Sequence, residues 1–258
     1  MRVLILRGER HRAPNGRHGD SGVIAFGSAG QWLLVNVSAP VAQRLDAGNL
    51  PAGLPGLADP SVRAIVLTDP QLEHVGGLLA LRRGAPIDLY VTPAVFEELS
   101  IHLPVLPALQ HYCGVHWRVV PVAGDCREAT FRIDGLPTIE FTALATQAPP
   151  WPHVQQQRAV VGDSIALVVT DTETGVSVFC APGLAHPGPQ EIEWMRRCDC
   201  VLLDDPRPRP GRMPAWVEWV DALPARHKVM LADADAPQAD RLARLGVAVA
   251  ADGMEIEL

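Results

Sequence analysis

The stretch AIVLTDPQLEHVGGLLALRRG, residues 64–84, joins an apolar run to a short polar segment and then to a second apolar run. The opening AIVLT predicts a buried strand, and VGGLLALRRG predicts a helix with basic residues in its last turn and Gly84 after it. Polar side chains between a strand and the following helix lie where α/β proteins bind their ligands. The stretch therefore predicts a ligand or metal site between Asp69 and His74.

Four side chains of that segment could carry the chemistry. Asp69 and Gln71 are two residues apart in an extended chain, so their side chains can point the same way. Glu73 and His74 follow beside the amino end of the predicted helix. Carboxylates and imidazole suit iron, zinc or manganese, but one histidine with carboxylates at a helix start also forms a capping and hydrogen-bonding cluster. Both interpretations stay open from the residues alone.

Composition narrows the class of protein. The chain has 258 residues, of which 48% are hydrophobic and 20% charged, and its formal net charge is −7. These values predict a soluble globular protein with a sizeable core, and the lack of a basic face argues against nucleic acid as a partner. The opening MRVLIL is too short for the apolar part of a signal peptide. No apolar run reaches the roughly 20 residues of a membrane span.

The cysteines point to a reducing compartment. There are five, an odd number, and no two form a C-x-x-C pair. Free thiols of this kind are typical of cytoplasmic proteins, so we expect a cytoplasmic location. The spacing Cys198-Asp-Cys200 could chelate a metal, but Cys200 opens the apolar run CVLLDD, which favours buried packing.

Strand and hairpin signals predict the architecture. GVIAFG and QWLLVNVS, residues 22–27 and 31–38, form one hairpin by their turn chemistry, and residues 166–181 form another. Strands and helices alternate along the rest of the chain, and no repeat or linker divides it. This pattern predicts an α/β fold with four αββα layers, two mixed β-sheets flanked by helices, in a single domain spanning residues 1–258.

The polar segment resembles a known signature. Asp69-Pro-Gln71-Leu-Glu73-His74 aligns with H-x-H-x-D-H of the metallo-β-lactamase superfamily, and Gly76-Gly77 follow. It is more specifically similar to the pyrroloquinoline quinone (PQQ) biosynthesis protein B family, in which Asp and Gln already replace the first two histidines. The other segments that resemble this family are LVNVSAPVAQRL (34–45), LPVLPALQHYCGVHW (103–117), FTALATQAPPW (141–151), FCAPGL (179–184) and DGMEIEL (252–258).

The resemblance implies a metallo-β-lactamase-like fold and a role in making PQQ, a redox cofactor cut from a peptide that bears Glu and Tyr. The implied chemistry is iron-dependent oxygenation of the tyrosine ring. Glu73 stands where the family has its metal-binding Asp, His74 matches its metal-binding His, and Asp204 matches an acidic ligand from a later strand. We therefore predict Glu73, His74 and Asp204 as catalytic and metal-binding residues, with Asp69 as a further metal ligand. The metal is Fe(II) or zinc.

Three departures from the family weaken the predicted metal site. The N-terminal cysteines that bind a structural zinc in the family are missing from residues 7–22, so we expect no zinc there. The family's loop after the acidic ligand is shortened to PRPRPGRMP. The family's late histidine would fall near Ala232, where only Asp233 or Asp235 could replace it. The remaining donors predict weak metal binding.

Two functions from different classes follow from these observations. The first is a metal-dependent oxygenase of PQQ biosynthesis. The second is a metal-free relative that binds PQQ, its precursor or a partner protein as a carrier or accessory, and a third, drifted role away from PQQ stays open. The expected partners are a PQQ precursor, other PQQ biosynthesis proteins and a second copy of the chain, without nucleic acid or membrane.

Overall fold

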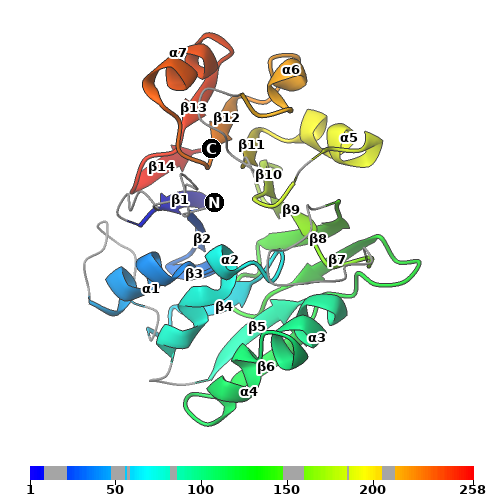
Figure 1. The fold of residues 1–258 in the computed structure, drawn as a ribbon. Coiled ribbons are helices and arrows are strands. Elements are labelled where there is room, and N and C mark those ends of the chain that lie inside the picture. Colours follow the sequence, from blue (N-terminus) through cyan, green and yellow to red (C-terminus); the bar gives the residue numbers. More distant parts are fainter. Residues whose placement is uncertain are drawn as a thin grey trace.

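The fold consists of two seven-stranded β-sheets that face each other, with helices on the outer side of each sheet (Figure 1). The computed structural model describes residues 1–8, 22–47, 56, 59–81, 86–147, 160–184, 186–204 and 213–258. The predicted αββα arrangement of two mixed sheets is confirmed.

The first sheet has the strand order β14-β1-β2-β3-β4-β5-β6. Its strands are β1 Arg2–Leu6, β2 Val23–Ser28, β3 Gln31–Val35, β4 Val62–Val66, β5 Ile87–Val91, β6 Val115–Val119 and β14 Met254–Glu257. Pairing is antiparallel from β14 to β3 and parallel from β3 to β6. The predicted hairpin of β2 and β3 is present, but its loop is only Ala29 and Gly30, because Gly27 and Ser28 belong to β2. Ala29 and Gly30 both have positive φ, at 49° and 77°, as type I′ turns require.

The second sheet has the order β13-β12-β11-β10-β9-β8-β7. Its strands are β7 Glu128–Arg132, β8 Ile139–Ala145, β9 Ile165–Asp171, β10 Ser177–Ala181, β11 Cys200–Leu203, β12 His227–Met230 and β13 Val247–Val249. Pairing is antiparallel from β7 to β10 and parallel from β10 to β13. Both sheets are therefore half antiparallel and half parallel.

Three apolar layers hold the four structural layers together. The helices that cover the first sheet are α1 Ala39–Asp46, α2 Leu72–Val75, the 3₁₀ helix η1 Gly76–Leu81, α3 Pro93–Ile101 and α4 Val105–Gln110 (Figure 1). The helices that cover the second sheet are α5 Pro189–Arg197, α6 Val217–Val220 and α7 Ala236–Arg244 (Figure 1). Phe26 and Phe141 lie in the layer between the sheets. Leu78 packs under the first set of helices and Met195 under the second.

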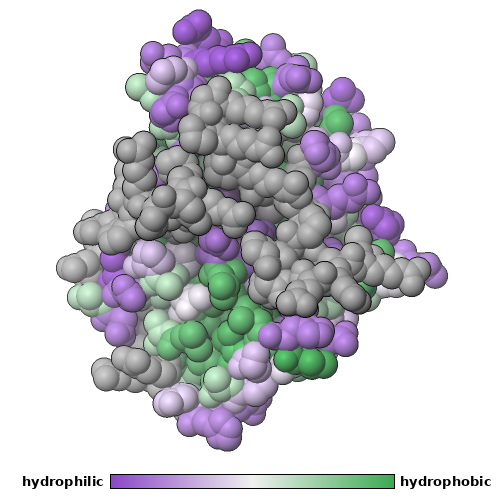
Figure 2. All heavy atoms as spheres, in the orientation of Figure 1, coloured by the Kyte–Doolittle hydropathy of each residue, from purple (hydrophilic) through white to green (hydrophobic). Residues whose placement is uncertain are grey.

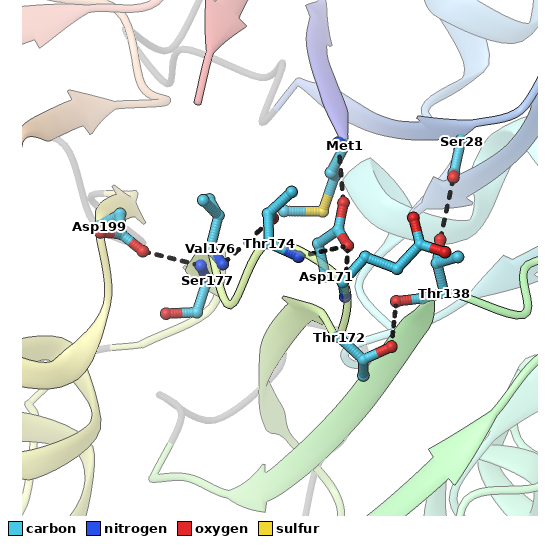
Figure 3. Close-up of polar contacts among 10 residues, drawn as sticks. Met1, Ser28, Thr138, Asp171, Thr172, Thr174, Val176, Ser177 and Asp199 are labelled. Atoms are coloured by element: carbon cyan, nitrogen blue, oxygen red, sulfur yellow. Dashed lines mark hydrogen bonds and ion pairs between the residues drawn. The ribbon is translucent and has the colours of Figure 1, made fainter.

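Polar contacts add to this packing at the end of the sandwich where β1 begins. The Met1 amine lies 3.0 Å from Asp171 Oδ2, at the end of β9 (Figure 3). The hydroxyls of Ser28 and Thr138 are 3.1 Å apart in the same region (Figure 3). Each contact joins a residue of the first sheet to a segment of the second.

Two predicted helices differ from the structure. The helix predicted from Val75 begins three residues earlier, at Leu72, and becomes a 3₁₀ helix at Gly76. Two successive glycines have low helix propensity, and the Gly77 N–H bonds to the Val37 carbonyl at 2.8 Å, outside the helix. The helix predicted in PAWVEWVDAL is only the single turn α6. Strand β14 was not predicted.

Several predictions lie outside the described residues. They concern the loop of residues 9–21 with its expected lack of zinc, the stop at Gly84, and the loop of residues 205–212. Within the part of the chain that is described, no helix has the length and apolarity needed to cross a bilayer. All five cysteines are free thiols. Cys198 and Cys200 pack in different apolar layers, so they do not form a chelating pair.

Candidate functional site

The predicted site lies where strands of both sheets end. Strand β4 ends at Val66, and Asp69 follows before α2 begins. From the second sheet, Gly183 after β10 reaches this point, because a Cβ on it would lie 2.7 Å from Asp69 Oδ2. Asp204 follows β11 at the same edge, close enough for its charge to act on His74. The segment of residues 69–74 therefore occupies the strand-to-helix junction expected from the sequence.

Asp69 and His74 form an ion pair inside the protein. Both side chains are buried, and Asp69 Oδ1 lies 2.7 Å from Nδ1 of His74. The same Oδ1 accepts the Gln71 backbone N–H at 3.0 Å, and Oδ2 accepts the hydroxyl of Thr68 at 3.2 Å. Each oxygen of Asp69 thus has a donor within the protein.

Electrostatics support the ionised form of this pair. Burial alone would raise the pKa of Asp69, but the charge and hydrogen bond of His74, with the donors at Gln71 and Thr68, hold it below its usual value. Burial alone would lower the pKa of His74, but the charge and hydrogen bond of Asp69 outweigh it, and Asp204 and Glu73 act in the same direction. The His74 pKa is therefore raised. Both shifts favour the charged forms, an imidazolium beside a carboxylate.

The other predicted residues are placed differently. Glu73 follows Leu72 in the first turn of α2 and is exposed. Asp204 is buried, and its backbone carbonyl accepts the indole N–H of Trp216 at 2.8 Å. Gln71 occupies the N-cap position of α2 and bonds through its backbone. All of these residues lie around the Asp69–His74 pair.

The described residues do not form a metal centre. Among them, no three side chains of His, Cys, Asp or Glu are grouped in a way that could hold a metal ion. The positions that could have replaced the late histidine are engaged in other contacts. Asp233 Oδ1 pairs with Nη2 of Arg7 at 3.0 Å, and Asp235 caps α7 by accepting the Gln238 N–H at 2.8 Å.

Sequence reasoning assigned no role in the site to a set of polar groups around the pair. The Asn36 amide bonds to both the hydroxyl and the N–H of Thr68, at 2.9 and 3.0 Å. The hydroxyls of Ser164 and Thr146 lie 3.0 Å apart. Asp163, next to Ser164, has a raised pKa because it is partly buried, and the charge of Asp69 adds to the effect. In the sequence, only their positions next to predicted strands could have indicated that these residues lie at the site. Contacts between residues far apart in the chain bring them there.

Apolar surface borders the helix that carries His74. Leu72 and Leu79 are each 53% exposed. Figure 2 shows a hydrophobic area on this side of the molecule, over the region of α2 and η1. A polar, charged pair therefore lies next to exposed apolar side chains.

This chain is similar to known proteins both in its domain family and in individual relatives. The model of the β-lactamase superfamily domain matches residues 31–232. Coenzyme PQQ synthesis protein B of Azoarcus sp. (strain BH72) is 34% identical, over 92% of this chain and 87% of the relative. The protein of the same name from Methylococcus capsulatus is 33% identical, over 96% of this chain and 91% of the relative. The chain belongs to the coenzyme PQQ synthesis protein B family.

Solved structures agree on the fold. Zn(2+)-bound PqqB from Methylobacterium extorquens has a TM-score of 0.78 at 18% identity, with all of both chains covered. A diphosphatase of the PhnP family has a TM-score of 0.66 at 14% identity, over 100% of this chain and 98% of that one. At these identities the likeness describes the fold, and the zinc belongs to the Methylobacterium protein.

Proposed function

We propose that this protein takes part in PQQ biosynthesis by binding PQQ or a precursor at the Asp69–His74 edge, as a carrier or accessory protein. Family membership supports the pathway, because the relatives are named for coenzyme PQQ synthesis. The observation that carries the binding role is the buried contact between Asp69 and His74, in which both carboxylate oxygens of Asp69 have donors within the protein.

The metal implied by the fold family does not fit the described donors. A non-haem iron site needs three protein ligands with open positions beside them. Here both oxygens of Asp69 already accept hydrogen bonds, and Glu73 is exposed while its neighbour His74 is buried. A protonated His74 would also have to lose its proton before it could bind a metal.

The site offers two features suited to a tyrosine-derived quinone. The second ring nitrogen of His74, Nε2, can donate a hydrogen bond to a carbonyl or carboxylate oxygen when it carries a proton. Leu72 and Leu79 supply exposed apolar surface next to the helix that carries His74. Together they combine an apolar contact with a charged donor, as in most small-molecule sites.

One observation favours metal-dependent oxygenation as a second candidate. A histidine that binds a metal through one ring nitrogen usually donates the N–H of its other ring nitrogen to a carboxylate or another acceptor. This hydrogen bond fixes the orientation of the ring. His74 Nδ1 has such a partner in Asp69. In this alternative Nε2 of His74, Glu73 and Asp204 would bind Fe(II) or zinc weakly, and Asp69 would hold the imidazole in place.

Titration of anaerobically purified protein distinguishes the candidates. We expect PQQ to bind with the same affinity before and after treatment with EDTA, and His74→Gln to weaken it about tenfold through loss of one charged hydrogen bond. His116→Gln is the matched control, since His116 is an exposed histidine with its own carboxylate partner, Asp88. Binding that appears only after Fe(II) is added, or oxygen uptake with a tyrosine-containing precursor peptide, would favour the oxygenase instead.

A further inference from the structure

Asn36, at the end of β3, has an unusual backbone. It is a buried residue with φ of 62°, in the left-handed region that residues other than glycine seldom adopt. Asparagine tolerates this region better than most residues, but the conformation still costs energy. Conformations of this kind persist where the surrounding structure requires them, so its contacts identify what Asn36 does.

The backbone turn at Asn36 directs the chain toward α2. Immediately after it, the Val37 N–H donates to the His74 carbonyl at 2.7 Å. The Val37 carbonyl accepts the Gly77 N–H at 2.8 Å. Through these two hydrogen bonds, the backbone of Val37 is attached to α2 at His74 and to the start of η1 at Gly77.

The Asn36 side chain has only one consistent orientation. Thr68 N–H is a donor 3.0 Å from the atom assigned as Oδ1. If the amide were flipped, two donors would face each other there, so the carbonyl must lie on this side. Nδ2 is then 2.9 Å from the hydroxyl oxygen of Thr68 and donates to it.

This orientation sets the direction of the Thr68 hydroxyl. Its single hydrogen has two acceptors at 3.2 Å, Asn36 Oδ1 and Asp69 Oδ2. Oδ1 already accepts the Thr68 N–H, whereas Asp69 is a carboxylate, and hydrogen bonds to ionised acceptors are roughly twice as strong. The hydroxyl therefore donates to Asp69, whose other oxygen faces His74.

We propose that Asn36 is a positioning residue, which through Thr68 fixes the Asp69 carboxylate so that it holds Nδ1 of His74. The inference rests on the proposed function only in that His74 faces the ligand. The chain of contacts runs from Asn36 to Thr68, then to Asp69, and ends at His74. It joins the end of β3 to the end of β4 and to α2.

Exchange of the His74 Nδ1 proton tests the proposal in the whole protein labelled with ¹⁵N-histidine. We expect a slowly exchanging proton that is missing in His74→Gln. Asn36→Gly keeps the backbone conformation but loses the amide, and should speed this exchange at least about tenfold, since two hydrogen bonds are lost. Ala29→Gly is the backbone control, because it also removes a side chain at positive φ but lies in the β2–β3 turn.

A second pair of variants keeps the test decisive if Asn36→Gly folds poorly. Thr68→Val removes the hydroxyl and should speed the exchange, whereas Thr68→Ser keeps the hydroxyl and should leave it slow. Unchanged exchange in both Asn36→Gly and Thr68→Val overturns the proposal. So does equally faster exchange of backbone amides throughout both sheets, because that result would assign Asn36 a role in global stability alone.

PQQ titration of the same variants separates this inference from the proposed function. If wild-type protein does not bind PQQ but Asn36→Gly still speeds the exchange, the proposed function fails and the positioning role stands. If PQQ binds and the exchange does not change, the positioning role fails by itself.

Discussion

At the scale of single residues, Asp69 and His74 show how a buried carboxylate is compensated within the protein. A buried carboxylate is costly unless it is paired and hydrogen-bonded. Asp69 satisfies this with one imidazole, one backbone N–H and one hydroxyl. A metal cation is therefore not required to compensate its charge.

Removing that compensation should destabilise the protein. Asp69→Asn leaves His74 buried without its counter-ion, so we expect a loss of about 3 kcal/mol in the free energy of unfolding at pH 6. Asp88→Asn, which removes the partner of the exposed Arg118, should cost less than about 1 kcal/mol. Urea unfolding measures both, and equal losses would contradict a special role for the buried pair.

The difference between wild type and Asp69→Asn should depend on pH. The raised pKa of His74 means that its contribution is complete below its unfolded pKa of about 6.5 and is lost as pH rises through the folded value. The lowered pKa of Asp69 means that its contribution is complete above about 3.9 and is lost as pH falls through the folded value. Unfolding measured at pH 5, 7 and 9 should show the largest difference at pH 5. A difference that grows toward pH 9 would refute the ion pair.

At the scale of elements, the connection after β3 and the α2–η1 segment fit together backbone to backbone. A Cβ on Gly77 would lie 2.4 Å from Val37 Cγ1, 2.6 Å from the Ser38 carbonyl oxygen and 2.7 Å from that of Val37. Main-chain atoms cannot rotate away as a flexible side chain can. The second glycine of the signature is thus explained by close packing rather than by ligand binding.

Gly77→Ala should destabilise the protein by about 1–3 kcal/mol or more, because the clash involves the backbone that follows Asn36. Gly76→Ala is the matched control. Its Cβ would meet only Ala39 Cβ at 3.7 Å, and its φ of −59° is helical, so we expect it to be neutral or slightly stabilising. Thermal unfolding of the two variants provides the comparison, and similar melting temperatures would show that the contact can relax.

Patterns between sequence neighbours predicted the helices and strands better than they predicted the contacts between distant residues. The β2–β3 hairpin and α3 follow from turn chemistry and from a proline at a helix start, both of which act between sequence neighbours. Strand β14 was missed because MEIE is short and exposes three of its four residues at least partly, so only pairing with β1 makes it a strand. Asp69 and His74 were predicted as site residues from their place between a strand and a helix and from the resemblance to a family signature. Asn36 was not, since it is 32 residues from Thr68 and only the β3–β4 pairing brings them together.

At the scale of the whole molecule, stability comes from the three apolar layers. The layer between the sheets contains Phe26 and Phe141, both almost fully buried, and further layers lie under each set of helices. Buried apolar surface of this kind supplies the dominant favourable term in the free energy of folding.

Metal addition should raise the melting temperature only slightly. With a dissociation constant of about 0.1 mM, 1 mM Fe(II) under anaerobic conditions adds about 1.4 kcal/mol, or about 3 °C for a chain of this size. We expect weak metal binding because the raised pKa of His74 favours the protonated imidazole, which does not bind a metal, and because both oxygens of Asp69 already accept hydrogen bonds. His74→Gln should abolish the rise, and Cys126→Ser, at an exposed thiol outside the site, should keep it. Iron that stays bound through EDTA at one ion per chain, and whose removal lowers the melting temperature by much more than about 3 °C, would show a complete metal centre and would favour the oxygenase over the carrier.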